Sequence, residues 1–182
     1  MSKVIIFPTD TVYGIGTPIF DLEGIEKIYE IKKRPKNKPL ACLCSSIEQI
    51  KSIAKVSVWE QKIIDELFPG ALTIILNSCD EVKDKIGYDT IAVRIPNYDL
   101  ARSILDNYGP MLTTSVNDSG SVPLNEYNEI KEKYEDLVSY VYPTSISSSN
   151  VPSTIIKLDN KEVKIIREGE IKLKDILNAL EK

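Results

Sequence analysis

The chain has 182 residues, 42% of them hydrophobic and 27% charged, which is typical of a folded globular protein. Its formal charge of −4, from 23 basic and 27 acidic residues, argues against a protein whose whole surface binds nucleic acid. With no histidine and three cysteines, the chain excludes a Ser-His-Asp triad, a Cys-His dyad, a histidine-ligated zinc ion and a four-cysteine metal site.

The first half of the chain alternates short apolar runs with helical patterns. The run 4–7 ends at Pro8 and predicts a buried strand, and the hydroxyl- and glycine-rich segment 9–16 predicts a loop. Asp21 is the expected N-cap of a helix that runs to about Lys33. The other elements expected here are a strand over 40–43, two helices opened by capping boxes at Ser46 with Gln49 and Ser57 with Glu60, and strands over 72–76 and 91–95.

The second half continues the same alternation. Asp99 is the expected N-cap of a helix to about Asp106, and a strand follows over 111–115. The remaining expectations are a helix over 126–136, a strand over 137–142, a mobile serine-rich stretch over 143–150, a hairpin of 154–158 with 163–167, and a tail helix after Leu173. Interleaved strands and helices predict one α/β domain over residues 1–182.

The N-terminal part of the sequence also bears on location. No secretory leader precedes the first apolar run, and no run anywhere approaches the length of a membrane span. The cysteines are few and odd in number, as expected where thiols stay reduced. We therefore expect a cytoplasmic protein.

Two segments in the first fifth of the chain carry candidate binding chemistry. Residues 8–16 (Pro-Thr-Asp-Thr-Val-Tyr-Gly-Ile-Gly) supply hydroxyls, an acid and glycines at a strand end, where ligands of α/β sheets collect. A turn whose glycines need positive φ is the alternative interpretation. Residues 27–38 contain six basic residues and one acidic residue, which favours a bound polyphosphate or, alternatively, a solvated helix end.

Three further features lie later in the chain. The polar segment 113–120 follows an apolar strand, and within it Ser115 and Asn117 face the same way if the backbone is extended. Arg94 and Arg167 each end a strand of apolar residues, where a guanidinium needs an anionic partner. That partner is either a ligand or a carboxylate of the same chain.

Taken in order, these motifs resemble the YrdC/TsaC family of L-threonylcarbamoyladenylate synthases, over about residues 4–169. Each motif is weak alone, but seven in the right order are specific. The matches are Pro-Thr-Asp-Thr-Val-Tyr-Gly-Ile-Gly (8–16), Lys-x-Arg-Pro (32–35), Pro-Gly-x-x-Thr (69–73), Ala-Val-Arg-x-Pro (92–96), Ser-x-Asn-x-Ser-Gly (115–120), Ser-Thr-Ile (153–155) and a late arginine before a glycine (Arg167).

The resemblance implies a short, single-domain form with a twisted mixed β-sheet and helices on both sides around a concave basic pocket. It implies a nucleotidyltransferase that makes threonylcarbamoyl-AMP and pyrophosphate from L-threonine, bicarbonate or CO₂, and ATP, for N6-threonylcarbamoyladenosine modification of tRNA. Mg²⁺ would enter with ATP, with no metal ligand assigned to the protein. The product would pass to downstream tRNA threonylcarbamoyl-transfer proteins.

The same resemblance implies roles for single residues. Lys32 and Arg34 would be catalytic by neutralising the phosphates, and Arg94 would take the carboxylate of threonine. The full threonine set would be Thr11, Arg94, Ser115 and Ser153, and the ATP set would be Arg34, Lys38, Thr90, Asn117, Asn125 and Arg167. The chain departs from the family in the segment 144–150, which is serine-rich where the family is Asp-Gly-Gly-rich. A non-catalytic RNA-binding module of the same fold is the alternative, and direct tRNA binding is left open.

Overall fold

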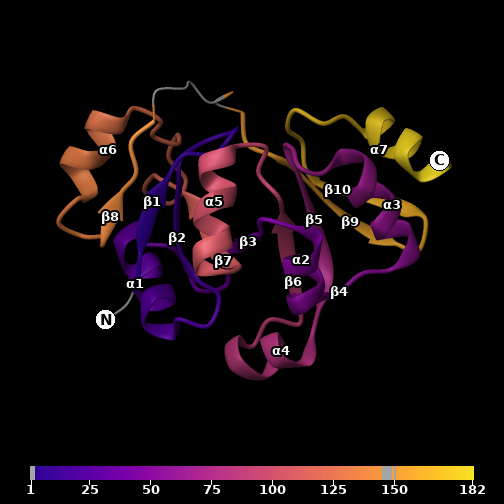
Figure 1. Cartoon of the computed structure of the whole chain (residues 1–182), viewed down its shortest axis with the longest axis horizontal. Helices are drawn as coiled ribbons and strands as arrows, with labels where there is room; N and C mark the ends of the chain where they lie inside the picture. The colour runs from indigo at the N-terminus through magenta and orange to yellow at the C-terminus, as the bar shows by residue number, and fades with distance from the viewer. Residues whose placement is uncertain (1–2, 145–148, 150) are drawn as a thin grey trace.

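The computed structural model describes residues 3–144, 149 and 151–182. In this part of the chain ten strands form one mixed sheet in the order β10-β9-β5-β6-β3-β7-β2-β1-β8, with the short β4 paired to β5 (Figure 1). The strands are β1 (Ile5–Phe7), β2 (Gly14–Pro18), β3 (Ala41–Leu43), β4 (Ala54–Lys55), β5 (Leu72–Ser78), β6 (Thr90–Arg94), β7 (Met111–Ser115), β8 (Tyr140–Val141), β9 (Thr154–Asp159) and β10 (Glu162–Arg167).

Seven helices accompany the sheet within the described residues. They are α1 (Leu22–Lys32), α2 (Ile47–Ile53), α3 (Val58–Leu67), α4 (Asp80–Ile86), α5 (Asp99–Tyr108), α6 (Tyr127–Tyr134) and α7 (Leu173–Glu181). The pairs β1–β8, β3–β6 and β5–β9 are parallel, and the other pairs are antiparallel. The α/β class and the mixed sheet predicted from the sequence are confirmed.

Local capping explains where the helices begin. The Asp21 carboxylate accepts from the Gly24 amide at 2.9 Å and opens α1, and Lys33 ends that helix in the left-handed region with φ of 49°. Ser57 and Glu60 form the expected reciprocal capping box of α3. These short-range signals were readable in the sequence because each depends on residues only three positions apart.

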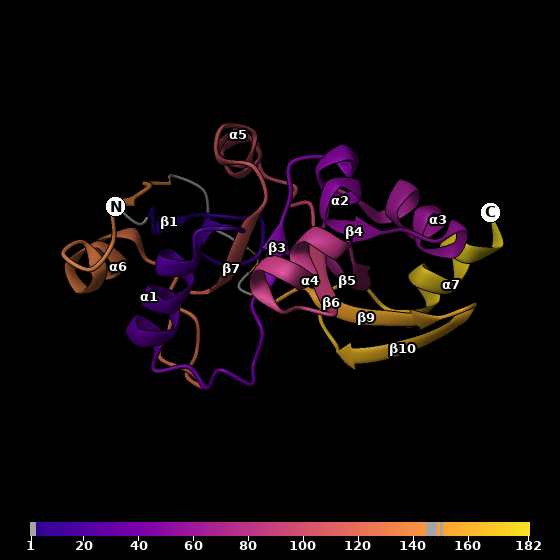
Figure 2. The same ribbon diagram turned by 90° about the horizontal axis from the view of Figure 1, so that it is seen from below.

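The faces of the sheet follow from side-chain alternation. On β1, Ile5 and Phe7 pack with α5, whereas Ile6 joins the larger core cluster that includes residues of the six other helices. Figure 2 shows α5 and α1 on opposite sides of the strands β1, β2 and β7. Helices therefore cover both faces of the sheet. The face that carries α5 is covered less completely, and the cavity opens on that face.

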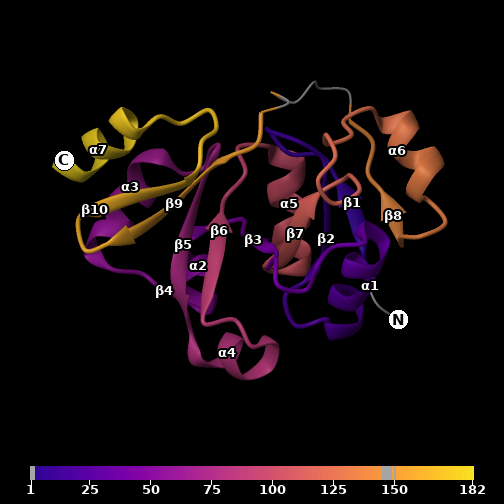
Figure 3. The same ribbon diagram turned by 180° about the vertical axis from the view of Figure 1, so that it is seen from behind.

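The hairpin of β9 and β10 forms as predicted and turns at Asn160, whose φ is 54°. β9 pairs in parallel with β5, so the hairpin extends the sheet beyond β5. Figure 3 shows the hairpin beside α3 and α7, at the opposite end of the molecule from α6 and β8. The predicted tail helix after Leu173 is α7, and it packs against α3.

Several predicted boundaries are wrong. Residues 14–16 belong to β2, and the first turn of α5 begins after Tyr98, so Asp99 is a helical residue and not the N-cap. The expected strand 137–142 shrinks to β8, and the helix 126–136 shrinks to α6. The elements β4 and α4 were missed, because neither shows a sustained apolar period. The serine-rich residues 145–148 and 150 lie outside the described part of the chain.

Candidate active site

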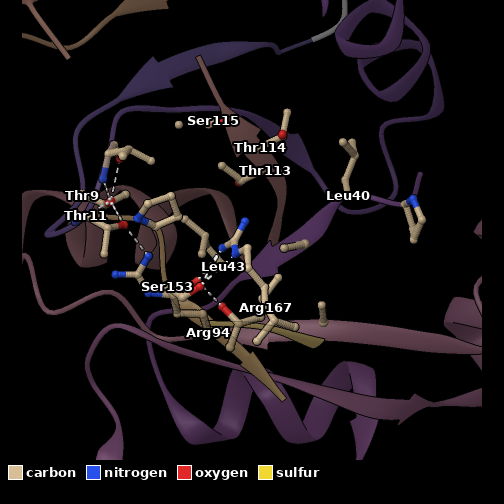
Figure 4. Close-up of a pocket in the computed structure, with 18 of the residues that line it drawn as sticks. Thr9, Thr11, Leu40, Leu43, Arg94, Thr113, Thr114, Ser115, Ser153 and Arg167 are labelled. Carbon is tan, nitrogen blue, oxygen red and sulfur yellow. Dashed lines mark hydrogen bonds between the residues drawn. The ribbon is translucent and has the colours of Figure 1, made fainter. Parts of the chain in front are cut away.

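A cavity of about 360 Å³ opens between the β5–β6–β9–β10 half of the sheet and the β2–β3–β7 half. Figure 4 shows side chains from both halves pointing into it. The polar and charged residues that line it are Thr9, Thr11, Tyr13, Arg34, Thr73, Thr90, Arg94, Thr113, Thr114, Ser115, Ser153 and Arg167. The motifs that are far apart in the sequence therefore meet around one space.

Strand alternation explains how β6 contributes to this cavity. Thr90, Ala92 and Arg94 lie on the cavity side, whereas Ile91 and Val93 are buried in the larger core cluster. Because successive side chains of a strand point to opposite faces, β6 places apolar side chains in the core and aims the Arg94 guanidinium at the cavity. Because Ile91 and Val93 are 1% and 0% exposed, the register that aims Arg94 at the cavity is fixed by packing.

The glycines of the first motif do not fit the alternative interpretation as turn residues, and Gly14 lines the cavity. Gly14 and Gly16 lie in β2 opposite β7, and neither adopts a positive φ. A Cβ atom on Gly14 would meet the Thr113 methyl carbon at 2.7 Å, and one on Gly16 would meet the Thr113 hydroxyl at 2.6 Å. They are needed because the Thr113 side chain occupies the space of their missing side chains, so the reading as positive-φ turn residues is wrong.

Arg94 is almost fully buried and already held by three groups. Its Nε donates to the Gly70 carbonyl at 2.7 Å, Nη1 donates to the Thr11 hydroxyl at 2.7 Å, and Nη2 donates to the Asp10 carboxylate at 2.5 Å. Desolvation lowers the pKa of Arg94, and the negative charge of Asp10 opposes that shift. A guanidinium has five N–H donors, so two remain after these three bonds.

The hydroxyl of Thr9 is fully used by the protein, whereas that of Thr11 is not. Thr9 Oγ1 donates its proton to the Val12 carbonyl at 2.7 Å and accepts from the Thr11 and Val12 amides at 3.2 and 3.3 Å. Thr11 Oγ1 accepts from Arg94 and lies 3.1 Å from Thr9 Oγ1. Because the amides take both lone pairs of Thr9 Oγ1, the Thr11 hydroxyl remains available to a ligand in the cavity.

Arg167, at the end of β10, lines the same half of the cavity as Arg94 (Figure 4). Its Nε and Nη2 donate to the Ser153 carbonyl at 3.1 and 2.8 Å, while the Ser153 hydroxyl lies 2.7 Å from that of Thr73. Desolvation lowers the pKa of Arg167, and the nearby positive charge of Arg94 lowers it further. The buried Gly169 lets this segment lie against the backbone at Ser153, because a Cβ atom there would collide with it.

Arg34 approaches the cavity from the basic segment after α1. Its Nε donates to the Lys38 carbonyl at 2.9 Å and its Nη2 to the Pro39 carbonyl at 3.0 Å. The Tyr29 hydroxyl also donates to the Lys38 carbonyl and lies 3.2 Å from the Tyr88 hydroxyl, so the end of the segment is tied to the body of the protein. In the described residues no carboxylate forms an ion pair with Arg34, so its charge faces the cavity without compensation.

Lys32 lies behind the cavity wall and is 2% exposed. Its Nζ donates to the carbonyls of Ser115 and Asn117 at 2.5 and 2.6 Å and to Asn117 Oδ1 at 2.8 Å. Burial lowers the pKa of Lys32 to about 8; the positive charge of Arg34 also lowers it, while the negative charge of Asp118 raises it. Its ammonium protons are thus directed at the protein itself, and the role at the phosphates implied by the resemblance stays a prediction.

The cavity brings together seven of the eleven predicted site residues and leaves four outside its lining. Thr11, Arg34, Thr90, Arg94, Ser115, Ser153 and Arg167 line it. Among the described residues the lining does not include Lys38, Asn117 or Asn125, nor the predicted catalytic Lys32. Asn125 Oδ1 accepts from the Tyr13 amide at 3.0 Å, which supports the turn that carries Thr11.

Three residues close to this site were not among the residues predicted to bind threonine or ATP. Thr9 and Thr73 line the cavity, and Asp10 is the charge partner of Arg94. Thr9 and Asp10 belong to the first motif, and Thr73 ends the Pro-Gly-x-x-Thr motif, so the signal was present. Their partners could not be predicted because Asp10 and Arg94 are 84 positions apart in the chain.

Within the described ranges, no group of three or more His, Cys, Asp or Glu side chains is placed to hold a metal ion. None of the helices in the described part of the chain has the length and apolar character to cross a membrane.

The family to which the chain is similar follows from its sequence. A family model described as Sua5_yciO_yrdC, telomere recombination, matches residues 1–169. A Methanocaldococcus jannaschii protein with a provisional threonylcarbamoyl-AMP synthase name is 35% identical over 96% of this chain and 84% of its own length. The threonylcarbamoyl-AMP synthase of Vibrio campbellii is 31% identical over 92% of this chain and 93% of its own length.

Solved structures agree with the sequence matches. Sua5 of Pyrococcus abyssi, crystallised in complex with L-threonine, has a TM-score of 0.89 and 29% identity over 97% of this chain, which spans about half (53%) of the Pyrococcus chain. E. coli YciO has a TM-score of 0.86 and 28% identity over 97% of this chain and 87% of its own. From its fold, its ordered motifs and these matches, the chain belongs to the Sua5/YciO/YrdC family.

Proposed function

We propose that this chain is an enzyme that makes threonylcarbamoyl-AMP from L-threonine, bicarbonate or CO₂, and ATP, releasing pyrophosphate. The observation that carries the proposal is the meeting of Arg34, Arg94 and Arg167 with the hydroxyls of Thr11 and Ser115 around one cavity. Three guanidinium groups suit a triphosphate and a carboxylate, and hydroxyls suit a small polar amino acid. The Vibrio and Bacillus subtilis relatives carry the name of this activity.

The reaction needs no nucleophile from the protein. The amine of threonine loses a proton and bonds to the carbon of CO₂ to give a carbamate, whose oxygen then attacks the α-phosphorus of ATP. The bond from that phosphorus to the bridging oxygen breaks, and pyrophosphate leaves with the electron pair. This is an adenylyl transfer, so the protein would be a nucleotidyltransferase whose catalysis rests on positioning and on positive charge.

The positions and partners of the three arginines assign a different part of the substrates to each of them. Arg94 keeps two N–H donors beside Thr11 and is assigned the carboxylate of threonine. Arg34 has no carboxylate partner within the described residues and is assigned the phosphates. Arg167, with Thr90, lies on the β6–β10 side of the cavity and is assigned the nucleotide.

A divalent cation is proposed to enter with ATP. The described residues offer no cluster of three or more acidic side chains for it, and Asp10, between the cavity-lining Thr9 and Thr11, is engaged with Arg94. Mg²⁺ bound through substrate phosphates and water fits such a site, because Mg²⁺ commonly keeps several waters and few protein ligands. It would offset charge on the leaving pyrophosphate. We further propose that the product serves tRNA modification.

The test is an assay of pyrophosphate release with ATP, Mg²⁺ and bicarbonate, with and without L-threonine. We expect release that depends on threonine and disappears in an Arg94→Ala variant, with threonylcarbamoyl-AMP detected by mass spectrometry. Release that is equal with and without threonine would contradict the proposal. Binding of RNA with a steep salt dependence and no adenylate formation would favour the RNA-binding module instead.

A further inference from the structure

The group that lies behind Ser115 is a small, buried hydrogen-bond network. Lys32 at the end of α1 donates to the Ser115 and Asn117 carbonyls and to Asn117 Oδ1. The Ser115 hydroxyl donates to the same Asn117 Oδ1 at 2.7 Å, and Asn117 Nδ2 donates to the Ser121 carbonyl. The network joins α1 to the end of β7, which lines the cavity.

The number of protons on each group determines which atoms of this network donate and which accept hydrogen bonds. An ammonium group has three N–H donors, and all three of Lys32 are used on oxygen atoms of the protein. A serine hydroxyl has one proton, and that of Ser115 points away from the cavity to Asn117 Oδ1. Towards the cavity Ser115 therefore presents lone pairs only.

We propose that Lys32 and Asn117 are positioning residues that hold the Ser115 hydroxyl as a hydrogen-bond acceptor, so that the cavity selects a ligand group carrying an N–H or O–H at that point. If the proposed function holds, on which this inference rests, that group is the amino nitrogen or the β-hydroxyl of threonine. The role differs from contact with the phosphates, because Lys32 acts through Ser115 and touches no substrate.

Arg94 supplies the complementary groups in the same cavity. Its two remaining N–H donors can bind a carboxylate, and the Thr11 hydroxyl, which accepts from Arg94, lies beside them. An acceptor at Ser115 and donors at Arg94 match a ligand that carries both an N–H or O–H group and a carboxylate. A ligand with a second acceptor in place of the donor would face oxygen lone pairs, which is unfavourable.

A double-mutant cycle tests the inference through binding affinities measured by calorimetry. Lys32→Met removes the ammonium but keeps a long side chain, and leaves no buried charge behind. We expect Lys32→Met and Ser115→Ala each to raise the Kd for threonine about tenfold. The double variant should be within about twofold of the weaker single variant, because both changes remove the same contact. The Kd for ATP should change less than about threefold.

A phosphate role for Lys32 predicts the opposite pattern. ATP would then bind about tenfold more weakly to Lys32→Met, and the effects on threonine of the two substitutions would be absent or additive; either result overturns the inference. If Lys32→Met does not fold, Asn117→Ala gives the same test, since it removes the acceptor of Ser115 while Lys32 keeps its two carbonyl partners. Wild-type protein that binds ATP but no threonine would overturn the proposed function itself.

Discussion

The two sides of the cavity hold their arginines in opposite ways. On the strand wall, Arg94 is 5% exposed and fixed by Asp10, Thr11 and the Gly70 carbonyl. On the basic segment 33–39, Arg34 donates to the carbonyls of Lys38 and Pro39. The first arginine is oriented and its charge is compensated, whereas the second is tethered through its own loop and keeps its charge uncompensated.

This difference indicates where each kind of substrate charge belongs. A compensated, rigid guanidinium recognises by geometry, because its remaining N–H donors are aimed in advance. An uncompensated guanidinium on a loop attracts a multiply charged anion more strongly and can adjust to it. Substitutions on the wall should therefore affect folding first, and substitutions on the basic segment should affect ligand binding first.

The largest expected effect follows removal of the charge partner on the wall. Asp10→Ala should lower the free energy of unfolding by about 3 kcal/mol, because it leaves the buried Arg94 without its anion. Urea denaturation followed by circular dichroism measures this free energy. The Asp10→Asn variant should have a free energy of unfolding between those of the wild-type protein and Asp10→Ala, because its amide oxygen can still accept a hydrogen bond from Arg94. The matched control is Asp99→Ala, whose pair with Arg102 is exposed, and it should have no measurable effect. Equal losses at both sites would mean that the wall is not held by its ion pair.

On the basic segment the expected effect is on binding. Arg34→Ala should weaken ATP binding about 10- to 100-fold, as expected for hydrogen bonds between charged groups, and should leave the urea midpoint nearly unchanged. Lys36→Ala is the matched control: it removes a positive charge from the same segment, but Lys36 lies outside the cavity lining among the described residues and pairs with Glu26. It should change the Kd for ATP less than about threefold. Equal effects of the two substitutions would mean that Arg34 acts only through the overall positive charge of the segment and not through direct contact with ATP.

The sequence predicted the elements of the strand wall and the basic segment 33–39, but it did not predict how they contact one another. Strand alternation on β6 and the N-cap at Asp21 depend on near neighbours, so they could be predicted. The pairing of Asp10 with Arg94 depends on the loop between β1 and β2 meeting the end of β6, which lies far away in the sequence, and no short-range rule predicts it. The family resemblance, not the residue chemistry, predicted that these motifs would share one cavity.

Lys32 shows more clearly what could not be predicted from the sequence. Its place in a run of basic residues predicted a solvated or phosphate-bound cation, yet the side chain is buried. It is the last residue of α1 and turns towards the end of β7, whereas its neighbour Lys33 leaves the helix in a left-handed conformation. Six cations in one segment look alike in the sequence, and only the packing of α1 decides which of them faces inward.

The smallest expected effect is a pH dependence at the junction of the two sides. The pKa of Lys32 is lowered to about 8 by burial and by Arg34, against the opposing charge of Asp118. Below that pH the ammonium holds all three oxygen acceptors, and above it a neutral amine has only two protons for them. The Kd for threonine should therefore rise severalfold, by about one lost hydrogen bond, between one pH unit below and one above this pKa. Threonine titrates as well, so Lys32→Met serves as the reference: the step should be smaller in the variant by the contribution of Lys32. Identical pH profiles in the two proteins would show that the Lys32 charge does not act on the threonine subsite.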